Sequence, residues 1–270
     1  MVMLVKTMQV NTFKSAIDSV KDILGEVSME FCPVQGVTMP AVDAGKKAFV
    51  CLQMPVTSFE VFDVPKLVLA SFEISHLYKA VKNASSQCYN SLEIVVNDDV
   101  MSIHIHSTET GASIAYDLKL LKDVRIELSL PRIEYTITFD IDAREMLRYL
   151  RDIQAVGSMV KIRVKNRQVV LVATGALGKC KIKIPNYVKP VTQSRRPQIK
   201  GARFSPEQEI VARTANVAGR FNVRYLTAFC KGSCLASPMT VKIAHGMPLC
   251  CEFKVGGLGT LQFYLCAVTL

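Results

Sequence analysis

Basic residues recur at helical spacing in four segments of the chain. Residues at such spacing share one side of a helix, where Lys and Arg can contact phosphate groups without reading bases. Few aromatic residues accompany them, which disfavours a base-stacking platform for single strands. An ordinary solvated face is the alternative for any single helix, but four such segments favour phosphate binding. The candidates are Lys14, Lys21, Lys79, Lys82, Arg144, Arg148, Arg151, Arg220, Arg224 and Lys231.

Residues that could support catalysis or metal binding form no convincing constellation. His104 and His106 share one strand face, but no further ligand follows at a suitable spacing, which favours exposed histidines. Asp140 and Asp142 precede a helix, and helix capping is the simpler role for Asp142. The glycine-rich stretch 256–259 precedes no helix, so it indicates a hairpin turn rather than a phosphate loop. We therefore expect no enzyme activity, no metal and no cofactor.

Length and composition restrict the class of protein. The 270 residues allow one or two domains with a sizeable core, and no run of 18 apolar residues predicts a membrane span. Lys6 interrupts the apolar N-terminus and no small-residue cleavage site follows, so we expect no secretory signal. The net charge of +10 indicates a polyanionic partner, with plain solubility as the alternative.

The cysteine pattern favours free thiols over disulfides or zinc. The count of nine is odd, Cys250 and Cys251 are adjacent, and no Cys-x-x-Cys spacing occurs. Cys230 and Cys234 are four residues apart without a matching second pair. We expect a reduced, intracellular protein in which five thiols behave as small buried side chains. These are Cys32, Cys51, Cys180, Cys251 and Cys266.

Apolar spacing predicts the elements that position the basic residues. This spacing predicts helices over 13–24 and 73–82, the first capped by Asn11 or Thr12 and ended by Gly25. The repeat of this order in the second half predicts two more helices, over 144–157 and 218–231. Strands are expected over 27–32, 37–42, 48–55, 58–64, 92–96, 100–106 and 113–120, with a turn at 97–99.

The two halves of the chain repeat this order. A shift of 130 residues places Lys14 on Arg144 and Val20 on Leu150, and a shift of 148 places Met101 on Leu249. We therefore predict a duplicated α+β unit. The expected domains are 1–120 and 133–270, joined by an extended connector over 121–132. A proline-rich basic loop is expected over 185–206.

Six short segments follow one another along the whole chain: Gly36–Asp43, Tyr116–Leu121, Arg148–Gly157, Arg224–Leu226, Met247–Leu249 and Leu261–Leu265. In this order they resemble the proliferating cell nuclear antigen family of DNA sliding clamps. The resemblance implies an α+β fold of two similar domains, each with two helices packed on antiparallel sheets. It also implies a homotrimeric ring whose helices face duplex DNA and whose outer surface tethers a DNA polymerase. Departures from the cellular pattern and the richness in cysteine suggest a viral or divergent eukaryotic member, acting in the nucleus or at a viral replication site.

The resemblance also assigns two protein-binding surfaces. Partners with clamp-binding motifs would dock in a pocket made by Val42, Leu128, Leu130, Pro131, Pro248, Tyr264, Cys266 and Ala267. The family has Met where Val42 stands, Pro where Ala267 stands and His where Lys46 stands. Neighbouring subunits would pair through edge strands that carry Tyr116, Asp117, Leu118, Lys179, Cys180, Lys181 and Ile182. Cys180 replaces a family Gly.

Three other hypotheses remain open from the residues alone. The main alternative is a monomeric or dimeric basic processivity factor that binds DNA directly without a loader, because the net charge is high. An enzyme of DNA metabolism and a clamp-like transcription accessory protein are weaker alternatives.

Overall fold

The computed structural model describes residues 2–82, 89–122, 133–165, 168–184, 188–190 and 217–268. Most of the expected connector and of the proline-rich basic loop lies outside these ranges. The chain divides into two compact units, and each is described by itself. Unit 1 comprises Met1–Leu130, Cys234–Ala236 and Glu252–Phe263, and unit 2 comprises Pro131–Ser233, Ser237–Cys251 and Tyr264–Leu270.

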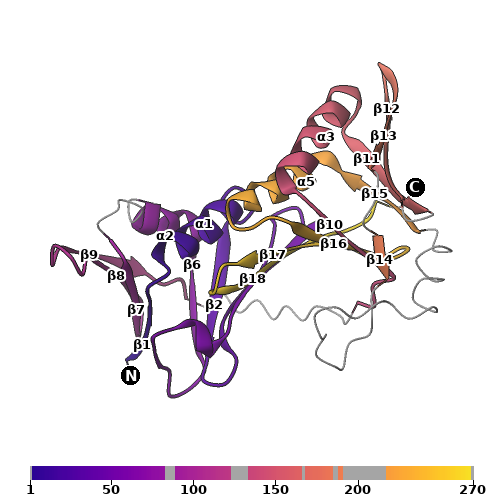
Figure 1. The fold of residues 1–270 in the computed structure, drawn as a ribbon. Coiled ribbons are helices and arrows are strands. Elements are labelled where there is room, and N and C mark those ends of the chain that lie inside the picture. Colours follow the sequence, from indigo (N-terminus) through magenta and orange to yellow (C-terminus); the bar gives the residue numbers. More distant parts are fainter. Residues whose placement is uncertain are drawn as a thin grey trace, which may run out of the picture. The chain divides into compact units, whose positions relative to one another are not determined.

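Unit 1 consists of antiparallel strands and two helices (Figure 1). Its strands pair in the orders β5-β1-β7-β8-β9 and β6-β2-β3-β4. The elements are β1 (Met3–Thr7), α1 (Val10–Val20), β2 (Glu26–Cys32), β3 (Gly36–Val42), β4 (Ala48–Met54), η1 (Val56–Ser58), β5 (Val61–Asp63), β6 (Val68–Glu73), α2 (Ile74–Val81), β7 (Ser91–Asn97), β8 (Val100–His106) and β9 (Ser113–Lys119).

Unit 2 contains a second helix pair and antiparallel strands in the orders β14-β10-β16 and β13-β12-β11-β15. Its elements are β10 (Ile137–Ile141), α3 (Ala143–Val156), β11 (Met159–Lys165), β12 (Gln168–Gly175), β13 (Gly178–Ile184), β14 (Val188–Pro190), β15 (Val217–Asn222), α5 (Val223–Phe229), η3 (Cys230–Cys234) and β16 (Met239–Ile243). Two further strands, β17 (Leu249–Val255) and β18 (Gly259–Leu265), contribute residues to both units.

The order of elements confirms the predicted duplication. Within the described ranges, each half of the chain runs strand, α-helix, five strands, α-helix, three strands. The first series is β1 to β9 with α1 and α2, and the second is β10 to β18 with α3 and α5. No helix in these ranges is long and apolar enough to cross a membrane.

Each helix has one apolar side because buried residues recur every three or four positions. In α1 these are Phe13, Ala16, Ile17 and Val20, all at most 1% exposed, and α1 contacts α2. The corresponding side of α3 carries Met146, Leu150 and Ile153, and α3 contacts α5 and the strands β12 and β13. Burying one side leaves the other side of each helix available for charge.

The first helix differs from the prediction at both ends. It begins at Val10 after Gln9, whose side chain makes no capping hydrogen bond, so the expected caps at Asn11 and Thr12 are wrong. It ends at Val20, and Leu24 is buried in the turn that follows. Within the expected strand 58–64 only Val61–Asp63 form a strand, β5, and Ser58 belongs to the short 3₁₀ turn Val56–Ser58. The strands β1 and β6 were not predicted.

The helix expected over 218–231 is also wrong in its first part. Residues Val217–Asn222 form β15, which pairs with β11, and the helix begins only at Val223. The side chain of Asn222 accepts a hydrogen bond from the Arg224 backbone N–H at 2.9 Å, which caps the new helix. Lys231 lies beyond α5, in η3.

Candidate nucleic-acid interface

The helix pair of unit 1 carries four of the predicted DNA-contacting residues. Lys79 lies in the last turn of α2 and Lys82 is its C-cap residue, and both are exposed. Lys14 lies on α1 and Lys21 is the C-cap residue of α1, and both are half-buried. Their spacing therefore correctly predicted that these four residues lie at the surface of the helix pair. It did not predict that the lysines of α2 are more exposed than those of α1.

Lys21 has two partners within unit 1. Its Nζ lies 2.6 Å from Asp18 Oδ1 and 3.7 Å from the ring centroid of Tyr78, a residue of α2. The hydrogen bond to Asp18 is the largest of the influences that raise the pKa of Lys21. The ammonium group thus joins α1 to α2, and Asp18 partly neutralises it. The pattern of basic residues gave no sign of this role, although Tyr78 lies in the helix that was expected over 73–82.

The helix pair of unit 2 presents a more exposed basic side. Arg144, Arg148 and Arg151 lie along α3 and are all exposed. Asp142 caps α3, as predicted, because its Oδ1 accepts hydrogen bonds from the Arg144 and Glu145 backbone N–H groups at 2.8 and 3.0 Å. Glu145 in turn accepts a hydrogen bond from the Tyr149 hydroxyl at 2.5 Å, which raises the pKa of Tyr149.

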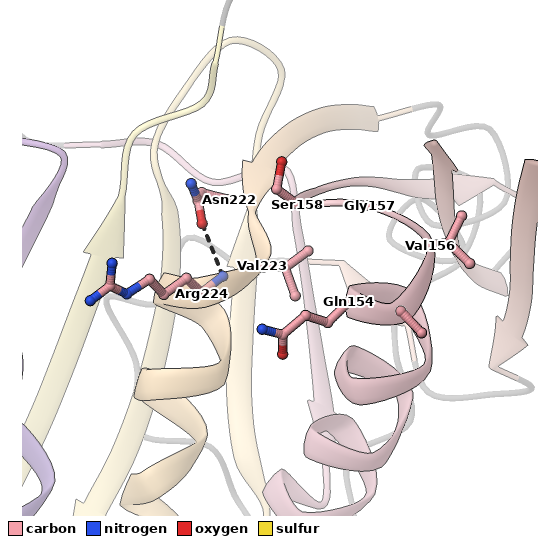
Figure 2. A pocket seen from close by; sticks show the side chains of 8 residues that line it. Gln154, Val156, Gly157, Ser158, Asn222, Val223 and Arg224 are labelled. Atoms are coloured by element: carbon pink, nitrogen blue, oxygen red, sulfur yellow. Dashed lines mark hydrogen bonds between the residues drawn. The ribbon is translucent and has the colours of Figure 1, made fainter. Parts of the chain in front are cut away.

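Arg224 stands at the beginning of α5, beside the end of α3. A pocket of about 320 Å³ lies at this junction. Figure 2 shows the residues that line it, with the hydrogen bond from the Arg224 N–H to Asn222 marked. The side chain of Gln154 also lines it, and no acidic residue does. Arg224 is therefore the one charged residue among neutral residues of this pocket, an arrangement that suits an anionic ligand such as a phosphate.

Arg220 does not belong to either helix face. It is exposed on β15, directly opposite Lys161 of β11, and its carbonyl accepts a hydrogen bond from the Val268 N–H at 2.8 Å. Its spacing of four from Arg224 matched a helix by coincidence. Gly219, a poor helix former, and the capping residue Asn222 were the sequence signals against that helix.

The residues assigned to the partner pocket are only partly described. Val42 ends β3 and is half-buried, and Pro248, Tyr264 and Ala267 are also half-buried. Cys266 is exposed, contrary to the expectation of a buried thiol. The remaining members, Leu128, Leu130 and Pro131, lie outside the described residues.

The residues assigned to the subunit contact lie on edge strands. Tyr116, Asp117 and Leu118 belong to β9, the last strand of its sheet in unit 1. The others, Lys179 to Ile182, belong to β13, the last strand of its sheet in unit 2. An edge strand has backbone N–H and C=O groups without an intramolecular partner, so each edge can accept a strand from another molecule.

The residues considered for catalysis make contacts within the fold, and His104 and His106 are half-buried rather than exposed as expected. The rings of His104 and His106 stack 6.1 Å apart on β8, and Asp140 accepts a hydrogen bond from the Thr240 hydroxyl at 2.8 Å. Gly257 lies in the turn between β17 and β18, as predicted, and donates to Gln9 Oε1. Among the described residues, no group of three or more His, Cys, Asp or Glu side chains could hold a metal ion. Eight of the cysteines lie in the described ranges, and all eight are free.

Comparison with known proteins matches both halves of the chain to one family. Residues 2–128 match the N-terminal domain of proliferating cell nuclear antigen, and residues 129–268 match its C-terminal domain. The proliferating cell nuclear antigen of Chaetomium thermophilum is 24% identical over 257 residues, which cover 95% of this chain and 94% of the relative.

Two further relatives cover nearly the whole chain. One is the probable DNA polymerase sliding clamp 1 of Paramecium bursaria Chlorella virus 1, 23% identical over 98% of this chain and 96% of the relative. The other is the proliferating cell nuclear antigen of Dictyostelium discoideum, 22% identical over 96% of each chain. Since the two family domains match in order and the second alone spans more than half of the residues, this chain belongs to the proliferating cell nuclear antigen family.

Proposed function

We propose that this protein is a DNA sliding clamp, a processivity factor that encircles duplex DNA and tethers a DNA polymerase. The observation that carries the proposal is the ordered match of both family domains over residues 2–268. The exposed arginines of α3 and the exposed lysines of α2 support it, because a clamp that slides needs phosphate contacts without base recognition. Its site of action would be the nucleus or a viral replication site.

The proposal assigns a role to three sets of residues. The basic residues of the two helix pairs would face the DNA backbone, and residues 121–132 would form the connector between the domains. The edge strands β9 and β13 would pair between subunits, because a head-to-tail contact of this kind closes a ring when its rotation is right. A homotrimer is the ring that the family resemblance implies.

The decisive experiment combines particle mass with DNA synthesis. We expect a mass in solution of about three times 29.9 kDa, as for a homotrimer, and we expect the protein, together with its loader, to lengthen the products of its cognate polymerase on a primed circular template. A control uses a linear template with free ends, from which a closed ring slides off. A monomer that leaves product length unchanged would contradict the proposal.

The partner pocket is tested separately with a peptide. A synthetic Gln-x-x-Leu-x-x-Phe-Phe peptide should bind, since aromatic side chains of such motifs insert into apolar grooves. Truncation by Tyr264→Ala should weaken binding by about tenfold or more, as the loss of an aromatic contact typically does. Phe62→Ala, a half-buried aromatic on β5, is the matched control. Equal binding by the wild type and by the Tyr264→Ala variant would contradict this assignment.

A second candidate function rests on the charge of +10. A monomeric or dimeric factor could hold DNA electrostatically without encircling it and without a loader. Such a factor would bind linear duplexes with blocked ends and with open ends equally well. A ring would be retained only on the blocked ones.

A further inference from the structure

Six basic side chains form two rows on one face of the β13-β12-β11-β15 sheet. Alternate residues of a strand point to the same face, and directly paired residues of neighbouring strands share a face. Lys161 pairs with Val172 and Val172 pairs with Lys181, so the two rows flank β12 on the same face. The rows are Lys161, Arg163 and Lys165 on β11, and Lys179, Lys181 and Lys183 on β13.

This face points away from the helices of unit 2. The intervening residues Val160, Ile162 and Val164 are fully buried, and α3 contacts β12 and β13. Figure 1 shows α3 and α5 together on one side of this sheet. Five of the six basic residues are exposed and Lys161 is half-buried. The basic sheet face is therefore a different surface from the basic sides of α3 and α5.

The face is hollowed near β15. A depression of about 570 Å³ is lined by Lys161, Arg163, Lys179 and Arg220, with Val172 among the apolar residues between them. Residues 267 and 268 border it, because the Val268 N–H is bonded to the Arg220 carbonyl. No acidic side chain and no Phe, Tyr or Trp lines the depression, and His245 is the one ring-bearing side chain among its lining residues.

The surplus charge of the whole protein resides in this part of the sequence. Residues 153–206 contain twelve Lys and Arg and no Asp or Glu. The other 216 residues contain 21 basic and 23 acidic side chains, a net charge of −2. Six of the twelve form the two rows of the basic sheet face. The face thus holds a large share of the charge that the helices do not explain.

We infer that the basic sheet face is a second nucleic-acid-binding surface, which contacts the phosphate backbone of duplex DNA. Successive cations in a row are about 6.6 Å apart, and two rows present a broad cationic strip that can follow a phosphate backbone. Without acidic neighbours in these strands, each cation can displace counterions from DNA. With His245 as the one ring at its border, the face has no row of aromatic side chains on which successive bases could stack, and it has no large aromatic anchor for an acidic peptide.

This inference does not depend on the proposed function. If the protein is a ring, the face binds DNA outside the hole. If the protein is a single subunit, the face gives it a loader-independent grip on the duplex. In both cases binding through this face adds to binding through the helix pairs.

Three triple variants that each remove three positive charges provide the test. The sheet variant is Lys161→Gln, Arg163→Gln and Lys165→Gln, on a strand that is not at an edge. The helix variant is Arg144→Gln, Arg148→Gln and Arg151→Gln. The control variant changes three exposed lysines of unit 1, Lys47, Lys66 and Lys254, to Gln.

Affinity for a labelled linear duplex of about 25 base pairs is measured by fluorescence anisotropy at several salt concentrations. We expect the sheet variant to bind about tenfold more weakly than the control variant at low salt. The negative slope of log K against log salt should become shallower by about 2.7, since each lost phosphate contact removes about 0.9 from its magnitude. Because the sheet face and the helix sides are separate surfaces, either one can still bind when the other is changed, so combining the sheet and helix changes should cost more affinity than the product of the two separate losses.

Two results would overturn the inference. One is a sheet variant that binds the duplex as tightly as the control variant does. The other is competition by polyglutamate as effective as that of duplex at equal charge, which would identify an acidic protein segment as the ligand. Acetylation of the unmodified protein tests the same point without any variant: duplex DNA should protect Lys161 and Lys165, and equal modification with and without DNA would contradict the inference.

Discussion

Among the basic residues of the helix pairs, Lys21 differs because its ammonium group contacts Asp18 and the Tyr78 ring within the same unit. Arg148 is exposed on α3 and is available to an anion in solution. Equal charge at two positions therefore does not imply an equal role. Residue types and spacing predict where a cation lies, whereas its partners depend on side chains brought close only by folding.

Substituting these two residues should separate the roles. Arg148→Gln should reduce the magnitude of the slope of log K against log salt for duplex binding by about 0.9, because one phosphate contact is lost. Lys21→Gln should change that slope by less than half as much and should lower the free energy of unfolding by about 0.5–1 kcal/mol, the usual size of an exposed cation–π contact. Salt-dependent binding and denaturant unfolding measure the two effects. Equal slopes for both variants would contradict the distinction.

The cysteines should differ in reactivity according to burial. Desolvation raises the pKa of the Cys51 thiol to about 11 and that of Cys230 to about 12, so both stay protonated near neutral pH. We expect a thiol reagent at pH 7.5 to label the exposed Cys266 first, and Cys51 and Cys230 only on unfolding. Peptide mass spectrometry over time measures the order. Early labelling of Cys230 would show that its region opens more readily than the structure indicates.

At the scale of elements, the sequence predicted what depends on local patterns. The apolar spacing of α1 and α2 identified these helices, the 130-residue repeat placed α3, and the strands expected between residues 27 and 120 were found within a few residues. β1 was missed because its five residues are stabilised by pairing with β5 and β7, which are distant in sequence. Arg220 was assigned to a helix because two arginines happen to be four residues apart, although β15 pairs with β11.

The cap of α3 makes a specific prediction for pH. Hydrogen bonds from the Ser237 hydroxyl, first, and from the Glu145 and Arg144 N–H groups lower the pKa of Asp142. A carboxyl group whose pKa is lower in the folded state stabilises the fold above its unfolded pKa, and this contribution is lost as the pH falls through the folded pKa. We expect Asp142→Ala to cost about 1 kcal/mol at pH 7.

The difference between wild type and Asp142→Ala should shrink below about pH 4, the ordinary pKa of an aspartate. Chemical unfolding of both proteins at several pH values from about 3 to about 7, a range that includes the ordinary titration of carboxyl groups, measures this difference in the free energy of unfolding. Asp140→Ala, at a residue that accepts from Thr240 but caps no helix, is the control. A difference that stays constant with pH would show that the charge of Asp142 does not contribute to the cap.

For the whole molecule, the two edge strands have unlike charge patterns. β13 carries three lysines on one face, whereas Asp117 of β9 is exposed and accepts a hydrogen bond from the Ser102 hydroxyl. If β9 of one subunit pairs with β13 of the next, Asp117 can offset part of the lysine row. Charge complementarity of this kind favours one strand pairing over others.

A charge exchange tests this pairing between subunits. Asp117→Lys should weaken self-association, since it adds a cation opposite β13, and combining it with Lys181→Glu should restore association in part. Sedimentation over a range of protein concentrations measures the assembly. Lys254→Glu, an exposed lysine on β17, replaces Lys181→Glu in the control pair. Restoration by both pairs alike would show that the effect is one of net charge.

The contact between Lys21 and Tyr78 has a practical consequence, because the sequence contains no tryptophan. Tyr78→Trp would introduce the only indole of the protein, directly beneath an ammonium group at the junction of α1 and α2. Tryptophan is the strongest aromatic partner for a cation, so the contact should persist. The emission of that single fluorophore would then report, without an attached dye, when a nucleic acid draws Lys21 away from the ring.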